Sequence, residues 1–422
     1  MIVVRGFGFM SLWAGCCFAT HGAAYQVPSK SEFLVEGLEE IEPAYDSFEG
    51  TMYAGLLPIR EFEKIPQIEK QGEDIGYYMF WLYLPDEMES PDSISVWFNG
   101  GPGCSSFHAG MMMENGPVTT PLHPAGYMMG EKESDEAPFI ENENSWTKVT
   151  TMLYVEQPAG PNGVGFSHGG REPVNETDVG QDFYEFLQNF FAVFVDQKYK
   201  RLFLVGESYA GYYVPGVAKY IHDENKMNLF NGTPHRVLNL AGIALGNGWS
   251  DAAIQGPAVI DYAWWHGMID TVTRDAFHAE WENCAKHKHN MHPPDKETEP
   301  APFHSFTVPD ECGIMGAILQ AAGAGLLERG DPNTYDVSTW DPYDILNKDD
   351  NVNVRFFNNP AVQEKLHVHP EGIHWMGCIP GKMMSSIVVV PPHSWEAALY
   401  SHYYDRIECR CWKTPSIVYR KQ

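Results

Sequence analysis

The chain has 422 residues, of which 44% are hydrophobic and 20% charged, a composition that excludes disordered, collagenous and coiled-coil proteins. Its 56 acidic residues outnumber 28 basic ones, so the net charge is −28 with histidine neutral. Because such a surface repels phosphate backbones and anionic lipids, the charge argues against nucleic-acid binding and against stable membrane association.

Residues 1–24 are predicted to form a signal peptide. The chain has a short basic start ending at Arg5, and the apolar stretch Gly6–Ala19 that follows is too short to span a bilayer. Gly22–Ala24 offers the small residues that a signal peptidase needs. A buried N-terminal helix is the alternative, but several glycines interrupt it. We therefore expect a protein of the secretory pathway, either secreted or held in a vacuole or lysosome.

Six cysteines follow the predicted signal peptide, and an oxidising compartment would let them form up to three disulfides in any of fifteen pairings. They are Cys104, Cys284, Cys312, Cys378, Cys409 and Cys411. Cys104, directly after a glycine-rich turn, is predicted to be a disulfide cysteine rather than a nucleophile. Asn175 and Asn231 each begin an Asn-X-Thr sequon, so both are predicted glycosylation sites.

Strand-like and helical segments alternate in the middle of the chain. The strand-like runs are Ser93–Phe98, Thr151–Val155, Arg201–Val205 and Val237–Leu245. Apolar residues from Val179 to Phe194 recur at helical spacing, and Asp178 can cap or charge the start of that helix. This alternation predicts an α/β fold with a mostly parallel central sheet and helices on both faces.

The alternation stops between about residues 251 and 350, where we expect an insertion over one end of the sheet. The predicted organisation is one domain over residues 25–380 and a divergent tail over residues 381–422. Within the insertion, Cys284, His287, His289 and His292 match no structural zinc spacing, and adjacent lysines oppose a cation. A solvated loop is expected there, and no metal or other cofactor is predicted.

A serine on a turn is the strongest chemical signal. Gly206-Glu207-Ser208-Tyr209-Ala210-Gly211 follows a predicted strand and precedes a helix-compatible run, which is the context of a nucleophilic serine at a strained bend. The residues two before and two after the serine must be small so that the chains can pass, and here they are Gly206 and Ala210. The alternative is that the serine lies in an ordinary loop and has no catalytic role. Ser208 is the predicted nucleophile.

The second signal is the glycine-rich turn Asn99–Gly103, directly after the first strand-like run. Acyl transfer through a serine requires two backbone donors for the oxyanion, one after the serine and one from an earlier glycine-rich loop. The N–H groups of Tyr209 and Gly101 fit these two roles. A tight turn without function is the alternative for this motif taken by itself.

Several blocks of the sequence resemble the signature segments of serine carboxypeptidases. They are Trp97–Ser106, Glu156–Pro158, Gly206–Pro215 and Gly242–Gly248, and Tyr262–Asp270 and Asn358–His367 are also similar. The resemblance runs from about Tyr45 to about Cys378. It implies the α/β-hydrolase fold with a helical insertion.

The resemblance also implies a site for the terminal carboxylate of a peptide. In the family, residues at the positions of Asn99, Gly100 and Glu207 hold this group, and a second glutamate at the position of Glu114 shares their hydrogen bonds. Elementary electrostatics agrees, because a glutamate beside a bound carboxylate must be protonated to donate a hydrogen bond. Binding should therefore be favoured at acidic pH.

The sequence departs from the family where the catalytic aspartate and histidine are expected. After residue 350 the only aspartate is Asp405, and no histidine follows it. His393 and His402 precede that aspartate and lack the loop context of a catalytic base. The fold is therefore expected to be incomplete at its C-terminal end, through truncation, a gene-model error or true loss of catalysis.

The leading functional hypothesis is a serine-type carboxypeptidase that releases C-terminal residues at acidic pH through an acyl-Ser208 intermediate. Its substrates would be the C-termini of peptides or proteins, and the oligomeric state is left open. One alternative is an acyltransferase on the same fold. The other is a catalytically inactive or truncated carboxypeptidase-like protein that only binds peptides.

Overall fold

The structure is a computed structural model that describes residues 26–86, 91–120, 139–285, 318, 321, 352–369 and 372–379. The predicted signal peptide and divergent tail lie outside the described residues, and so do His393, His402 and Asp405. The histidines at 287, 289 and 292 lie outside them as well. In the described part of the chain, no helix is long and apolar enough to cross a membrane.

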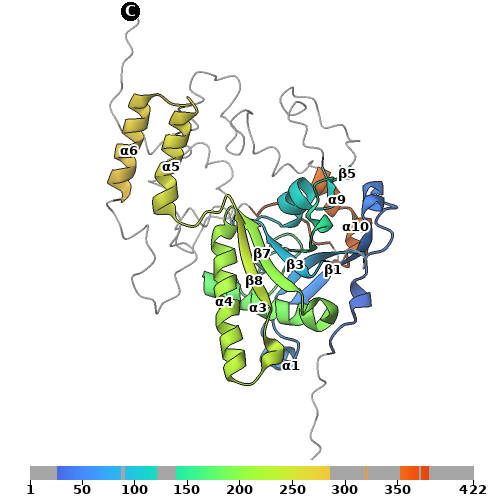
Figure 1. Cartoon of the computed structure of the whole chain (residues 1–422). Helices are drawn as coiled ribbons and strands as arrows, with labels where there is room; N and C mark the ends of the chain where they lie inside the picture. The colour runs from blue at the N-terminus through green and yellow to red at the C-terminus, as the bar shows by residue number, and fades with distance from the viewer. Residues whose placement is uncertain are drawn as a thin grey trace, which may run out of the picture.

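The described residues form a mixed sheet of six strands in the order β1-β2-β6-β3-β7-β8 (Figure 1). The strands are β1 (Gly50–Pro58), β2 (Tyr77–Pro85), β3 (Ser93–Phe98), β6 (Thr151–Val155), β7 (Arg201–Glu207) and β8 (Leu240–Gly246). The four strands β6, β3, β7 and β8 are parallel, whereas β1 pairs antiparallel with β2, and β2 with β6. The expected parallel core is confirmed, and two antiparallel strands extend it. A separate pair joins β4 (Val118–Thr119) to β5 (Ile140–Glu141).

Strand β2 shows how the sheet separates two apolar cores. Its side chains alternate, so Tyr78, Phe80 and Leu82 join one cluster, while Met79, Trp81 and Tyr83 join the other. The first cluster packs against α3 (Glu176–Val193) and α4 (Ala210–Phe230). The second packs against η3 (Phe107–Asn115), α9 (Val352–Phe357) and α10 (Pro360–Lys365). Helices therefore cover both faces of the sheet, as expected.

The start of α3 is capped by Asn175 rather than by Asp178. Oδ1 of Asn175 accepts a hydrogen bond from the N–H of Asp178 at 2.9 Å, as an N-cap residue does. Asp178 lies in the first turn, where its negative charge is favourable to the helix dipole. Of the two roles expected for Asp178, the structure shows the electrostatic one.

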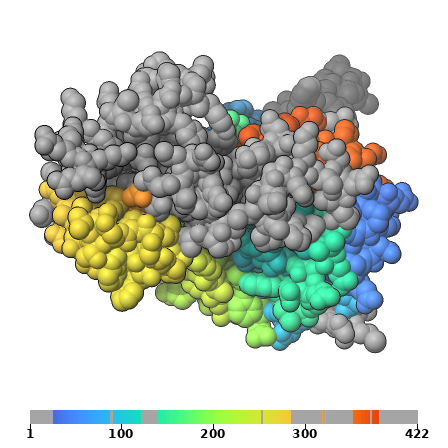
Figure 2. Space-filling view, turned by 90° about the horizontal axis from the view of Figure 1, so that it is seen from above, coloured from blue at the N-terminus to red at the C-terminus, as the bar shows by residue number. Residues whose placement is uncertain are grey.

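Helices α5 (Ala252–Trp265) and α6 (Thr271–Ala285) lie beyond β8 and have an apolar cluster of their own, which includes Ile260, Phe277 and Trp281. Figure 2 shows this yellow pair at one side of the molecule, opposite the blue N-terminal elements. The remaining helical segments are short: η1 (Lys30–Phe33), η2 (Pro43–Ser47), α1 (Ile65–Gln71), η4 (Trp146–Lys148), η5 (Val195–Gln197) and η6 (Pro234–Arg236).

Candidate active site

Ser208 occupies a strained turn between β7 and α4. Its φ angle is 60°, in the left-handed region that residues other than glycine rarely adopt. Two backbone hydrogen bonds hold the turn against the end of β8: the Ser208 N–H donates to the Gly246 carbonyl at 3.1 Å, and the Ser208 carbonyl accepts from the Trp249 N–H at 2.7 Å. The serine is thus fixed at the carboxyl end of the parallel strands, at the N-terminus of a 21-residue helix.

The small residues around Ser208 are there because the chains pass very close to each other. A Cβ atom on Gly206 would lie 2.6 Å from Cβ of Ala210 and 2.5 Å from the carbonyl oxygen of Phe98. Neither distance is compatible with a side chain, because the Phe98 oxygen belongs to the neighbouring strand and cannot move freely. The turn therefore requires glycine two residues before the serine, for the steric reason that the sequence suggested.

The glycine-rich turn after β3 packs directly on this bend. A Cβ atom on Gly100 would lie 2.6 Å from Cβ of Ser208 and 2.6 Å from the backbone nitrogen of Tyr209. The next residue, Gly101, has a φ angle of 111°, which favours glycine. Two segments about a hundred residues apart in the sequence are thus in contact, and they are the two segments predicted to supply the nucleophile and the oxyanion donors.

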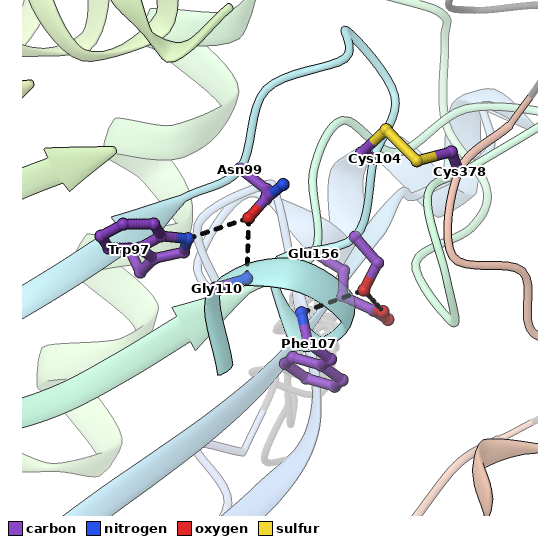
Figure 3. The surroundings of a disulfide bond; sticks show 8 residues. Trp97, Asn99, Cys104, Phe107, Gly110, Glu156 and Cys378 are labelled. Atoms are coloured by element: carbon purple, nitrogen blue, oxygen red, sulfur yellow. Dashed lines mark hydrogen bonds between the residues drawn. A yellow bond between two sulfur atoms is a disulfide. The ribbon is translucent and has the colours of Figure 1, made fainter. Parts of the chain in front are cut away.

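Asn99 is held in one orientation at the end of β3 (Figure 3). Its side-chain oxygen Oδ1 accepts two hydrogen bonds, one from the indole Nε1 of Trp97 at 3.0 Å and one from the N–H of Gly110 at 3.1 Å. Because the oxygen is committed to these two donors, the amide nitrogen points away from them. This arrangement presents an N–H donor group beside the glycine-rich turn.

A disulfide and two backbone hydrogen bonds anchor the far end of the glycine-rich turn. Cys104 is bonded to Cys378, which confirms the prediction that Cys104 is a disulfide cysteine. Beside the disulfide, the N–H of Ser105 donates to the Gly377 carbonyl at 2.8 Å, and the N–H of Ile379 donates to the Gly103 carbonyl at 2.9 Å. The turn is therefore fixed from both sides, by Ser208 and by the segment around residue 378.

Glu114 and Glu207 form a carboxyl pair joined by a hydrogen bond between their side chains. Burial of the Glu114 carboxyl group, together with the neighbouring charge of Glu207, raises the pKa of Glu114 to about 8. Glu114 as a whole is an exposed residue, so solvent screens part of this interaction. Glu207 lies directly before Ser208, and the pair therefore shares at least one proton next to the candidate nucleophile at neutral and acidic pH.

A buried carboxyl group that the sequence did not single out supports the same region. Glu156 is fully buried, and its side chain accepts hydrogen bonds from the Ser105 hydroxyl at 2.5 Å, the Trp375 indole at 2.7 Å and the Phe166 N–H at 2.6 Å. Burial raises the pKa of Glu156 to about 7, although these three donors act in the opposite direction. Figure 3 places this carboxyl group close to the Cys104–Cys378 disulfide. Glu156 lies within the block Glu156–Pro158, but nothing in that pattern showed its partners.

The two predicted glycosylation sites differ in their surroundings. Asn231 is exposed at the end of α4, while Asn175 is half-buried and caps α3 through its oxygen. A glycan is attached to the side-chain nitrogen, so the capping hydrogen bond of Asn175 would survive the modification. Both sites stay predictions. Among the described residues, no group of His, Cys, Asp and Glu side chains has the arrangement of a metal site.

Comparison with known proteins gives a consistent result. The family model described as "Serine carboxypeptidase" matches residues 46–388. The chain is 31% identical over 407 residues to the pheromone-processing carboxypeptidase KEX1 of Coprinopsis cinerea, covering 91% of this chain and 59% of that protein. It is 31% identical over 301 residues to a carboxypeptidase Y homolog of Arthroderma benhamiae, covering 69% of this chain and 53% of that protein. The chain thus spans about half of the length of the curated relatives that it matches.

A solved structure has the same fold. The crystal structure of the prohormone-processing carboxypeptidase KEX1 from Saccharomyces cerevisiae superposes with a TM-score of 0.64. The match is 24% identical in sequence and covers 85% of this chain and 73% of that one. This likeness supports the α/β-hydrolase fold, and the family model covers most of the chain. The protein belongs to the serine carboxypeptidase family.

Proposed function

We propose that this protein is a serine-type carboxypeptidase that releases the C-terminal residue of peptides or proteins through an acyl-Ser208 intermediate. The observation that carries the proposal is the carboxyl pair of Glu114 and Glu207 beside Ser208. An endopeptidase cleaves inside a chain and does not need to bind a terminal carboxylate. An enzyme that recognises a free terminal carboxylate does need such a pair, because a protonated carboxyl group donates a hydrogen bond to the carboxylate.

The other donors of the carboxylate site come from the turn after β3. The amide nitrogen of Asn99 points away from the two groups that bind its oxygen, and the backbone of Gly100 lies against Ser208. In the proposal, Asn99, Gly100, Glu207 and Glu114 together hold the terminal carboxylate. The last peptide bond of the substrate is then placed over Ser208.

The chemistry follows from this placement. The Ser208 oxygen attacks the carbonyl carbon, and the N–H groups of Gly101 and Tyr209 stabilise the resulting oxyanion. The C–N bond breaks, the amine leaves with a proton, and an acyl ester remains on Ser208. Water then hydrolyses the ester and regenerates the hydroxyl group. A base must accept the Ser208 proton in the first step, and the candidates His393 and His402 lie outside the described residues.

Recognition of the terminal carboxylate is expected at neutral and acidic pH and should be lost above about pH 8. Glu114 has a raised pKa of about 8 and is protonated below that value, so the donor to the substrate carboxylate is available in acid and is lost as the pH rises. Acid also neutralises part of the net charge of −28. A vacuole, a lysosome or an acidic medium outside the cell would meet both conditions. These locations agree with the proposed signal peptide over residues 1–24 and the proposed glycans on Asn175 and Asn231.

The test separates binding from catalysis. Binding of a peptide with a free C-terminus is compared with binding of the same peptide carrying a C-terminal amide, and the protein is also treated with a phosphonofluoridate probe. Tighter binding of the free acid together with covalent labelling at Ser208 supports the carboxypeptidase. Tighter binding of the acid without labelling identifies a peptide-binding protein instead. Equal binding of acid and amide would reject the carboxylate site.

A further inference from the structure

A surface pocket is lined by residues of α4, which follows Ser208, and by residues of two neighbouring segments. Its volume is about 420 Å³, and it lies between the start of α3, the first three turns of α4 and the segment after β8. Glu176 comes from α3, Gly211 and Gly216 come from α4, and Ser250 comes from the segment after β8. Gly211 is only three residues after Ser208, and its N–H donates to the Ser208 carbonyl at 2.9 Å.

Glu176 brings an unsatisfied carboxyl oxygen to this pocket. Its Oε1 accepts a hydrogen bond from the hydroxyl group of Tyr209 at 3.4 Å. Its Oε2 is buried and has no hydrogen-bond partner among the residues that the structure describes. A buried polar atom without a partner is costly, so an occupant of the pocket that satisfies Oε2 would gain the hydrogen bond that is missing now. Gly216 has no side chain, and this leaves space beside Oε2. A Cβ atom at this position would lie 3.6 Å from Oε2 and occupy that space.

The order of the strands decides which part of a substrate reaches this pocket. Ser208 follows β7, which lies between β3 and β8. The proposed carboxylate site follows β3, and Ser250 of the pocket follows β8. A peptide whose terminal carboxylate is held on the β3 side therefore extends past Ser208 toward β8. The pocket then faces the residue that precedes the scissile bond, an assignment that rests on the proposed function.

We infer that the Glu176 pocket is a specificity site for the uncharged amide side chain of a glutamine or asparagine that precedes the scissile bond. The amide carbonyl accepts a hydrogen bond from Oε2 of the protonated Glu176, and the amide nitrogen donates to the same carboxyl group. The apolar part of the side chain packs along Gly211 and Tyr212, which also line the pocket. Glu176 is thus a specificity-determining residue of the acyl side.

The charge state of the pocket agrees with a neutral occupant. Burial raises the pKa of Glu176 to about 8, so its carboxyl group in the pocket is neutral at neutral and acidic pH. An ammonium or guanidinium group has hydrogen-bond donors only, so Glu176 would have to lose its proton before it could pair with such a group. Lys219 also lines the pocket and repels a cation, although it is paired with Asp223. Tyr209, Tyr212 and Tyr213 also lie near Glu176, and they stay neutral because burial raises the pKa of each.

The experiment measures binding of three peptides that differ only in the residue before the scissile bond, which is glutamine, methionine or lysine. The measurement is made at mildly acidic pH, with free C-termini and with C-terminal amides. Methionine is close to glutamine in size and shape but lacks the amide group. We expect the glutamine peptide to bind on the order of tenfold more tightly than the methionine peptide, as one or two buried hydrogen bonds predict.

Three variants assign this preference to the pocket. Glu176→Leu should abolish the preference for glutamine, and Glu176→Gln should keep it because an amide also has a donor and an acceptor. Gly216→Leu, which fills the pocket and leaves the Glu176 carboxyl group in the chain, should abolish it as well and covers the case that Glu176→Leu fails to fold. Glu69→Leu, at an exposed position of α1, is the matched control and should change nothing.

The outcomes distinguish the two proposals. Tighter binding of the lysine peptide, or no discrimination among the three peptides, overturns the amide specificity. A glutamine preference that survives both Glu176→Leu and Gly216→Leu also overturns it. Equal binding of free acids and C-terminal amides would reject the proposed carboxylate site. The preference for glutamine can still be measured in that case, with the free acids or with the amides.

Discussion

The indole Nε1 of Trp375 donates a hydrogen bond of 2.7 Å to Oε1 of Glu156, although the two residues are 219 positions apart in the chain. Glu156 also accepts from Ser105, which follows the glycine-rich turn. The buried carboxyl group of Glu156 therefore connects the glycine-rich turn, which contains the candidate oxyanion donor Gly101, to the segment around Trp375. Changes at Glu156 should affect folding and the site together.

The first prediction concerns the pH dependence of stability. The pKa of Glu156 is about 7 in the folded protein, raised by burial from its ordinary value of 4.5. Its contribution to the free energy of unfolding is therefore fully present below pH 4.5 and falls as the pH rises toward 7, by at most about 3 kcal/mol. Denaturant unfolding at a series of pH values should show this fall.

The matched variant for that measurement is Glu156→Gln, which cannot titrate. Its unfolding curve should lack this part of the pH dependence, and its stability should be lower in acid because the new amide group faces three donors. A variant with the same pH profile as the parent protein would show that other carboxyl groups, such as Glu114 and Glu176, control this range.

The second prediction concerns recognition of the substrate carboxylate. Binding of a peptide with a free C-terminus should weaken as the pH rises through about 8, because Glu114 loses its proton there. Glu114→Gln and Glu207→Gln should bind with less dependence on pH, since an amide donates without a proton. Isothermal titration calorimetry across this range is the measurement. Identical profiles for variants and parent would reject the assigned role of the pair.

The third prediction tests the contact between the glycine-rich turn and Ser208. Gly100→Ala places a methyl group 2.6 Å from both Cβ of Ser208 and the nitrogen of Tyr209, so one of the two turns must move. We expect a loss of about 1–3 kcal/mol of stability together with loss of peptide binding. Gly232→Ala is the control: its added methyl meets no atom within 4 Å, so only the strain of its left-handed backbone, about 1 kcal/mol, is expected. Equal effects of the two variants would contradict the packing.

The fourth prediction concerns the disulfide. Cys378→Ser removes a cross-link between residues 274 positions apart and loosens the far end of the glycine-rich turn. The expected loss of stability is about 2–5 kcal/mol, measured by denaturant unfolding. Peptide binding should weaken at temperatures where the variant is still folded, because only the backbone hydrogen bonds of Ser105 and Ile379 then hold the far end of the turn. Unchanged binding would mean that the hydrogen bonds of Ser105 and Ile379 are sufficient.

The parallel core of the fold could be predicted from the sequence, and its antiparallel extension could not. Strands β3 and β6 have the predicted limits, while β7 extends to Glu207 and β8 begins only at Leu240. Strand β2 was missed because both of its faces are buried, so its sequence is apolar at almost every position and has no alternation. A run of this kind is compatible with a buried helix as well as with a strand.

The contact between the two turns of the candidate site could also be anticipated, because the turn around Ser208 and the glycine-rich turn each follow a parallel strand. The roles of the Glu156 and Glu176 carboxyl groups could not be predicted from the sequence. Their properties depend on burial and on partners that only the folded chain brings together, such as Trp375 for Glu156 and Gly216 for Glu176. Nothing in the local sequence marks a carboxyl group whose environment is assembled from distant segments.

The Cys104–Cys378 bond also imposes an order of events on biosynthesis. During translation, residue 104 leaves the ribosome long before residue 378 has been made. The thiol of Cys104 therefore waits without its native partner while β6, α3, β7 and α4 are synthesised. A thiol in this position can form mixed disulfides with other cysteines, and an exchange reaction must then release it. Where such mixed disulfides form, maturation requires a compartment that reshuffles disulfides as well as forming them.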